Sequence, residues 1–129
     1  MAHPPEVQSD LVIGVEKRQD YGPGGFMLIH HQPLTRFIGE LFVRFDAAPE
    51  DAALVASHLV AANLKGHDSH GVGMVPAYVG NIRRGKLNVA AQAKVVHDKG
   101  AVLLADGQMG FGQVVGRQAV DFALERVAS

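Results

Sequence analysis

The spacing of apolar side chains predicts a first helix over residues 33–45. These side chains recur at intervals of three and four residues, which places them along one face of a helix. They are Leu34, Phe37, Ile38, Leu41, Phe42 and Phe45. The sequence Asp46-Ala47-Ala48 interrupts this pattern, so we expect the helix to end there.

A second helix is predicted from Pro49 to about Leu64. Proline suits the first position of a helix, because an N–H group at that position would have no partner within the helix. Glu50 and Asp51 fall in the first turn, where the positive end of the helix dipole favours carboxylates. Gly66 is a natural stop after the last turn. The apolar positions of this helix include Leu54, Val55, Leu59, Val60 and Ala62.

The second half of the chain predicts a helix, a β-hairpin and a final helix. A helix over residues 74–84 would bury Val75, Tyr78, Val79 and Ile82. The apolar runs 93–97 and 101–105 flank Asp98-Lys99-Gly100, a short turn that fits a hairpin. The last helix is expected over residues 111–127. Three helices followed by two strands and a helix indicate the α+β class.

Residues 1–26 show little regular pattern. Proline and glycine gather in His3-Pro4-Pro5 and in Gly22-Pro23-Gly24-Gly25, and only Leu11-Val12-Ile13 resembles the start of a strand. The segment lacks the basic start, apolar stretch and cleavage site of a secretory signal. We therefore expect residues 1–26 to form a flexible leader.

Composition and charge exclude several classes of protein. The 129 residues include 47% hydrophobic and 19% charged residues and have a formal charge of −1, which fits neither a disordered chain nor a polycation that binds nucleic acid. No apolar run approaches the ~20 residues of a membrane span. The absence of cysteine excludes disulfides and thiolate chemistry and fits a reducing compartment. We expect one cytoplasmic domain that binds neither nucleic acid nor membrane.

The first candidate functional site is a segment between two predicted helices, Gly66-His67-Asp68-Ser69-His70-Gly71, which we call the histidine segment. Histidine can exchange a proton with a substrate hydroxyl near neutral pH, and a serine hydroxyl can donate to a carbonyl oxygen. The alternative is structural. Asp68 or Ser69 would then cap the following helix, and the histidines would be ordinary solvated residues.

Two other chemistries for the histidine segment have weaker support. His67 and His70 have a spacing seen in metal sites, and only His58 and His97 are obvious further ligands. Ser69 and His70 could form a nucleophile and base, but neighbours in sequence need not face each other.

A glycine-rich run follows the predicted hairpin, from Gly107 to Gly116. Its spacing approximates a loop that binds the pyrophosphate of a dinucleotide. Alternatively, Gly107 and Gly110 permit a tight turn, and Gly116 lets the last helix approach the hairpin.

A basic cluster, Arg83-Arg84-Gly85-Lys86, ends the third predicted helix. Cations are favoured at this end of a helix dipole, so a solvated helix end explains the cluster. The alternative is a site for a substrate carboxylate.

Taken together, these segments resemble the malate/L-lactate dehydrogenase family of non-Rossmann type, and within it the hydroxycarboxylate dehydrogenase branch. The resemblance is carried by residues 56–79, which include Asn63-Leu64-Lys65 and the histidine segment. It continues through Gly100-Ala101, Ala105-Asp106-Gly107 and the run from Gly110 to Val114, and it covers about residues 33–127.

The resemblance implies an enzyme that interconverts a 2-hydroxycarboxylate and its 2-oxo acid with NAD or NADP. Ser69 and His70 would be catalytic, with His70 also against the cofactor. Met74 stands where many members of other branches carry an arginine suited to a substrate carboxylate. Family members are longer, so the chain is expected to be the N-terminal part of such an enzyme and inactive alone. Residues 27–90 would form a helical subdomain, and residues 91–129 would begin the cofactor-binding domain.

A non-catalytic helical module for binding or oligomerisation is the alternative function. Three amphipathic helices without a covering domain would leave apolar surface exposed, which favours self-association. We expect a homodimer.

Overall fold

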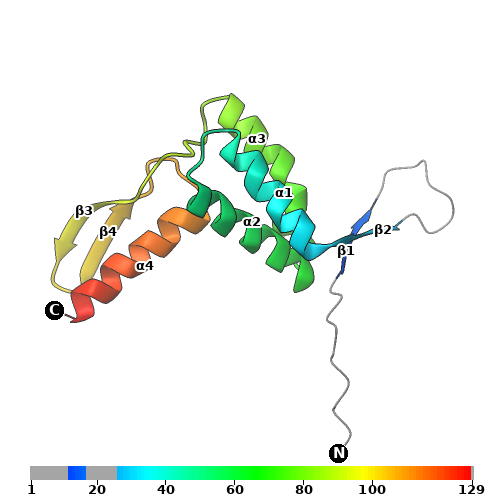
Figure 1. Ribbon diagram of the computed structural model, residues 1–129. Helices are drawn as coiled ribbons and strands as arrows, with labels where there is room; N and C mark the ends of the chain where they lie inside the picture. Colours follow the sequence, from blue (N-terminus) through cyan, green and yellow to red (C-terminus); the bar gives the residue numbers. More distant parts are fainter. Residues whose placement is uncertain (1–11, 17–25, 129) are drawn as a thin grey trace, which may run out of the picture.

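The computed structural model describes residues 12–16 and 26–128 (Figure 1). The helices are α1 (His31–Val43), α2 (Pro49–Leu64), α3 (Val75–Arg83) and α4 (Gly112–Ala128). Two short 3-10 helices, η1 (Asp68–His70) and η2 (Val72–Met74), join α2 to α3. The strands are β1 (Val12–Glu16), β2 (Phe26–His30), β3 (Lys94–Lys99) and β4 (Val102–Asp106). The predicted order of three helices, a hairpin and a helix is confirmed.

The helices agree closely with the sequence prediction. Helix α2 has the predicted bounds, with Pro49 in its first turn. Helix α1 begins at His31 instead of Pro33, and the Thr35 hydroxyl donates to the His31 carbonyl at 2.8 Å. Helices α3 and α4 differ from the prediction by single residues at their ends. The 3-10 helices were not predicted, because three-residue elements are too short to show periodicity.

The prediction of a flexible leader is wrong for residues 12–16. These residues form β1, which pairs antiparallel with β2 in a register from Val12 opposite His30 to Glu16 opposite Phe26. The run Leu11-Val12-Ile13 resembles the start of a strand, but a strand also depends on a partner segment, and nothing in the sequence marked residues 26–30 as that partner. The Pro-rich start and the Gly-rich run before Phe26 lie outside the described residues.

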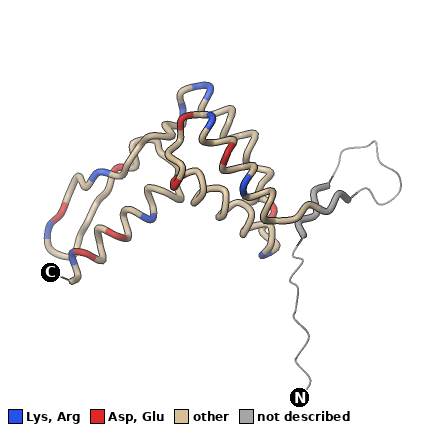
Figure 2. Tube along the Cα trace, in the orientation of Figure 1, with Lys and Arg blue, Asp and Glu red and all other residues tan. Residues whose placement is uncertain are grey.

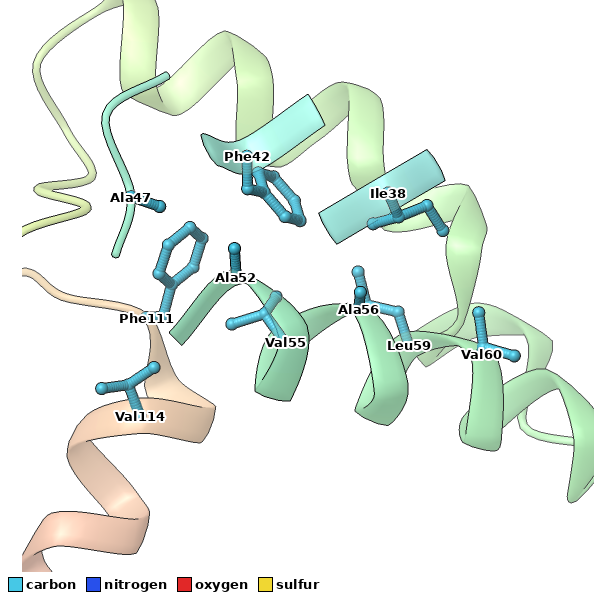
Figure 3. Packing of buried hydrophobic residues seen from close by; sticks show 10 residues of the cluster. All are labelled: Ile38, Phe42, Ala47, Ala52, Val55, Ala56, Leu59, Val60, Phe111 and Val114. Carbon is cyan, nitrogen blue, oxygen red and sulfur yellow. The ribbon is translucent and has the colours of Figure 1, made fainter. Parts of the chain in front are cut away.

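The core lies where α1, α2 and the start of α4 meet (Figure 3). The Phe42 and Phe111 rings pack edge to face, with centroids 5.2 Å apart, and Tyr78 of α3 lies against both. The buried cluster comprises Ile38, Phe42, Ala47, Ala52, Val55, Ala56, Leu59, Val60, Phe111 and Val114. Phe37, predicted on the buried face, is 62% exposed, because the face of α1 that α2 covers is narrower than its apolar stripe.

Hairpin β3–β4 and α4 extend as an arm away from the other helices (Figure 1). The strands are antiparallel, with an irregularity between Val95 and His97, and β3 runs to Lys99 instead of ending at His97. An ion pair joins the end of α4 to the hairpin, with Arg126 Nε 2.8 Å from Asp98 Oδ1. This contact joins the hairpin to the last turn of α4, and Val114 is the one buried residue of α4.

Basic and acidic residues are interspersed along the described chain, with no continuous basic stripe (Figure 2). None of the described helices has the length and apolarity that crossing a membrane requires.

Candidate active site

The histidine segment is held first by the end of α2. Gly66 has a positive φ of 79°, a conformation that glycine adopts readily. The N–H of His67 donates to the Ala62 carbonyl at 2.8 Å, and that of Gly66 donates to the Asn63 carbonyl at 2.9 Å. This pattern is a Schellman motif, which ends the helix and turns the chain sharply. The predicted stop at Gly66 is thus confirmed.

The side chain of Asn63 holds both ends of the turn that follows. Its Nδ2 donates to Asp68 Oδ1 at 2.6 Å, and its Oδ1 accepts the Val72 N–H at 2.6 Å. Gly71 is buried against this amide, and a Cβ at Gly71 would lie 1.9 Å from Asn63 Oδ1. Asn63 was not predicted to be a site residue. The signal was present, because a polar amide one turn before a glycine stop is suited to bonding the next segment.

Ser69 and His70 are brought together in η1. The Ser69 Oγ lies 2.9 Å from His70 Nδ1, within hydrogen-bond distance, and both residues are exposed. The contact occupies one ring nitrogen and restricts rotation of the imidazole. Although the sequence did not require these neighbours to face each other, the structure pairs them.

A groove of about 370 Å³ lies beside His70. We call it the basic groove; it is lined by His58, Ala61, Ala62, Lys65, His67 and His70. His58, Ala61 and Ala62 lie on one face of α2 at helical spacing, Lys65 directly follows the helix, and the two others come from the histidine segment. None of the six carries a negative charge. Two small alanines leave room for a ligand, while the basic side chains favour one that is anionic.

Comparison with known proteins decides the family. Residues 29–129 match the malate/L-lactate dehydrogenase family. The chain belongs to this family. The resemblance drawn from residues 33–127 is confirmed, together with the α+β fold.

Several relatives of the family illustrate the match. Hydroxycarboxylate dehydrogenase B of Escherichia coli (strain K12) is 43% identical over 95 residues, covering 74% of this chain and 26% of that protein. Malate dehydrogenase from Pyrococcus horikoshii OT3 has a TM-score of 0.74 at 32% identity, covering 85% and 32% of the two chains. Sulfolactate dehydrogenase from Methanocaldococcus jannaschii has a TM-score of 0.71 at 32% identity, covering 77% and 29%. The chain spans about a quarter to a third of the length of these relatives.

The structural alternative for the histidine segment is wrong about capping, although His67 and His70 are exposed as it expects. Neither Asp68 nor Ser69 caps a helix, because η1, η2 and α3 have no side-chain hydrogen bond at their N-caps. Asp68 accepts from Asn63 instead, and Ser69 contacts His70. These side chains therefore organise the segment itself.

The metal interpretation finds no support in the described part of the chain. Across residues 12–16 and 26–128, no group of three or more histidine, aspartate or glutamate side chains is placed to hold a metal ion. For the nucleophile interpretation, the Ser69 to His70 contact supplies the required proximity. Among the described residues, however, no carboxylate hydrogen-bonds to the pair to orient it as a triad would.

The glycine-rich run that starts at Gly107 forms a tight turn before α4. Gln108 and Met109 adopt positive φ angles of 51° and 58°, and the Gly110 N–H donates to the Gly107 carbonyl at 2.8 Å. A Cβ at Gly110 would lie 3.0 Å from Ala91 Cβ, so glycine permits close packing there. These contacts confirm the tight-turn interpretation for Gly107 and Gly110. The proposed role of Gly116 is wrong, because nothing lies within 4 Å of a Cβ at that position.

The basic cluster at the end of α3 makes local contacts. Arg84 Nη2 donates to Asn81 Oδ1 at 2.8 Å, and the Arg83 guanidinium lies 5.8 Å from the centroid of the Phe45 ring. These contacts support the helix-end interpretation. Met74, in place of the arginine of other branches, packs partly buried against the core. Among the described residues that line the basic groove, Lys65 is the one lysine.

Proposed function

We propose that Ser69 and His70 belong to the active site of an NAD(P)-dependent dehydrogenase that interconverts a 2-hydroxycarboxylate and its 2-oxo acid. One observation carries the proposal: His70, whose Nδ1 lies 2.9 Å from Ser69 Oγ, lines the basic groove. Family membership supports the reaction class, since relatives are named as hydroxycarboxylate, malate and sulfolactate dehydrogenases.

The groove is suited to a flat ring and an anionic group. Ala61 and Ala62 contribute small apolar side chains to its lining, which suits the face of a nicotinamide ring. When bound, a nicotinamide cofactor accepts or donates the hydride at the substrate carbon. The cofactor class, NAD or NADP, is part of this proposal.

The contribution of the chain itself is orientation and proton transfer. The Ser69 hydroxyl engages His70 Nδ1 and fixes the plane of the ring. A proton can then pass between His70 Nε2 and the substrate oxygen as the hydroxyl becomes a carbonyl or the reverse. A protonated imidazole also stabilises negative charge that develops on that oxygen.

Lys65 is proposed to hold the substrate carboxylate. It lines the same groove as His70, and its ammonium group can pair with a carboxylate. We expect Lys65→Met to weaken binding of a 2-oxo acid such as pyruvate about tenfold, as for loss of a charge-assisted contact. Lys86→Met, outside the groove, is the matched control. Equal affinities for both variants in calorimetric titration would contradict this role.

The first test of the site is a titration of the 129-residue chain with NADH and NADPH, followed by NMR of the histidine ring signals. We expect saturable shifts of the His70 ring signals that disappear in His70→Ala. His97→Ala removes a histidine on β3, outside the groove, and should leave them intact. If neither nucleotide shifts the His70 signals, the chain does not form this binding site.

A non-catalytic binding or oligomerisation module is the second candidate. Exposed apolar side chains on α4 favour it, with Leu124 at 62% and Val127 at 87% exposure. A homodimer and a cytoplasmic location are compatible with both candidates and are proposed with them. Self-association in sedimentation experiments without any nucleotide binding would favour the module.

A further inference from the structure

We infer that Asn63 is a positioning residue for His70. Its hydrogen bonds would hold the Ser69–His70 pair close to the end of α2 and so determine the position of the imidazole in the basic groove. This inference rests on the proposed function for its catalytic meaning, while its structural part can be tested separately.

The two hydrogen bonds of Asn63 enclose the catalytic pair. Its Nδ2 donates to Asp68, directly before Ser69, and its Oδ1 accepts from the Val72 backbone, two residues after His70. Both distances are 2.6 Å. One side chain therefore fixes the segment on either side of the pair.

The chemistry of the two partners requires an amide. A carboxylate such as that of Asp68 needs a donor, and the Val72 N–H needs an acceptor. This pairing also fixes which end of the amide is oxygen and which is nitrogen. An aspartate at position 63 would still offer an acceptor, but its negative charge would repel the Asp68 carboxylate and draw the side chain away from the Val72 N–H.

Burial cannot replace these bonds. Residues 65–70 are all exposed, so no apolar packing holds the pair in place. Segments with few buried contacts open readily unless hydrogen bonds retain them. In contrast, the part of α2 that carries Asn63 is held by packing, because Leu59 and Val60, one turn before Asn63, are buried in the core.

Gly71 allows the close approach of the amide to the backbone. Any Cβ at this position would lie 1.9 Å from the Asn63 oxygen. The position of the Ser69–His70 pair therefore depends on three residues: the amide of Asn63, the carboxylate of Asp68 and the glycine at position 71.

The experiment compares three variants of the 129-residue chain. Asn63→Asp removes the donor to Asp68, and Asn63→Asp with Asp68→Asn exchanges donor and acceptor, so that the bond can form again. Asn88→Asp is the matched control, because the Asn88 side-chain oxygen accepts from the Ala90 N–H, far along the sequence from the segment. The readouts are amide hydrogen exchange at Val72, the pH titration of the His70 ring by NMR, and NADH affinity.

We expect Asn63→Asp to raise Val72 exchange about tenfold, to shift the His70 ring titration and to weaken NADH binding. The exchanged double variant should recover all three, and Asn88→Asp should change none. Unchanged His70 titration and Val72 exchange in Asn63→Asp would overturn the inference, as would failure of the double variant to recover them. If exchange and titration respond but wild type binds no NADH, the positioning role stands and the proposed function fails.

Discussion

At the scale of single residues, the absence of a side chain at Gly71 is what the histidine segment depends on most directly. A Cβ there would overlap Asn63 Oδ1, which already accepts the Val72 N–H. We expect Gly71→Ala to lower the free energy of unfolding by about 1 to 3 kcal/mol, because the amide or the backbone must move.

Gly73→Ala is the matched control, since nothing lies within 4 Å of a Cβ at that position. Urea unfolding of both variants measures the difference. If Gly71→Ala is as stable as Gly73→Ala, the close contact between Gly71 and Asn63 is not a feature of the folded protein.

At the scale of elements, the arm is attached to the helices through the start of α4. Phe111 is 2% exposed and packs against Phe42 and Tyr78, while Val114 is the one buried residue within α4. We expect Phe111→Ala to cost about 3 to 5 kcal/mol, because it leaves a cavity between the two parts.

Leu124→Ala tests the far end of α4, where the side chain is 62% exposed. Its cost should stay within about 0.5 kcal/mol, as for other exposed positions. Thermal unfolding followed by circular dichroism measures both variants. Equal losses at the two positions would contradict the packing of α4 onto the core through Phe111.

At the scale of the whole molecule, the chain carries one side of a proposed reaction site. It spans 26% of the length of hydroxycarboxylate dehydrogenase B, and hydride transfer requires cofactor and substrate to be held in contact. We expect no measurable oxidation of NADH with 2-oxo acids by the 129-residue chain, even where NADH binding is detected. Turnover that His70→Ala abolishes would show instead that these residues suffice for catalysis.

The sequence by itself determined the helical framework and the family. Periodic apolar residues and local end signals predict α1, α2 and α3, because helix formation depends on neighbours three and four residues away. The histidine segment could be predicted to be a functional site, because a simple turn does not require serine and histidine between glycines. The family resemblance then singled out Ser69 and His70.

The tertiary structure decided what depends on distant partners. Strand β1 exists through its pairing with β2, and the exposure of Phe37 depends on how much of α1 is covered by α2. The contacts of Asn63 with Asp68 and Val72, and the basic groove beside His70, arise only when the chain turns back at Gly66. Local patterns encode helices, whereas the placement of a side chain in a site depends on hydrogen bonds and packing between segments.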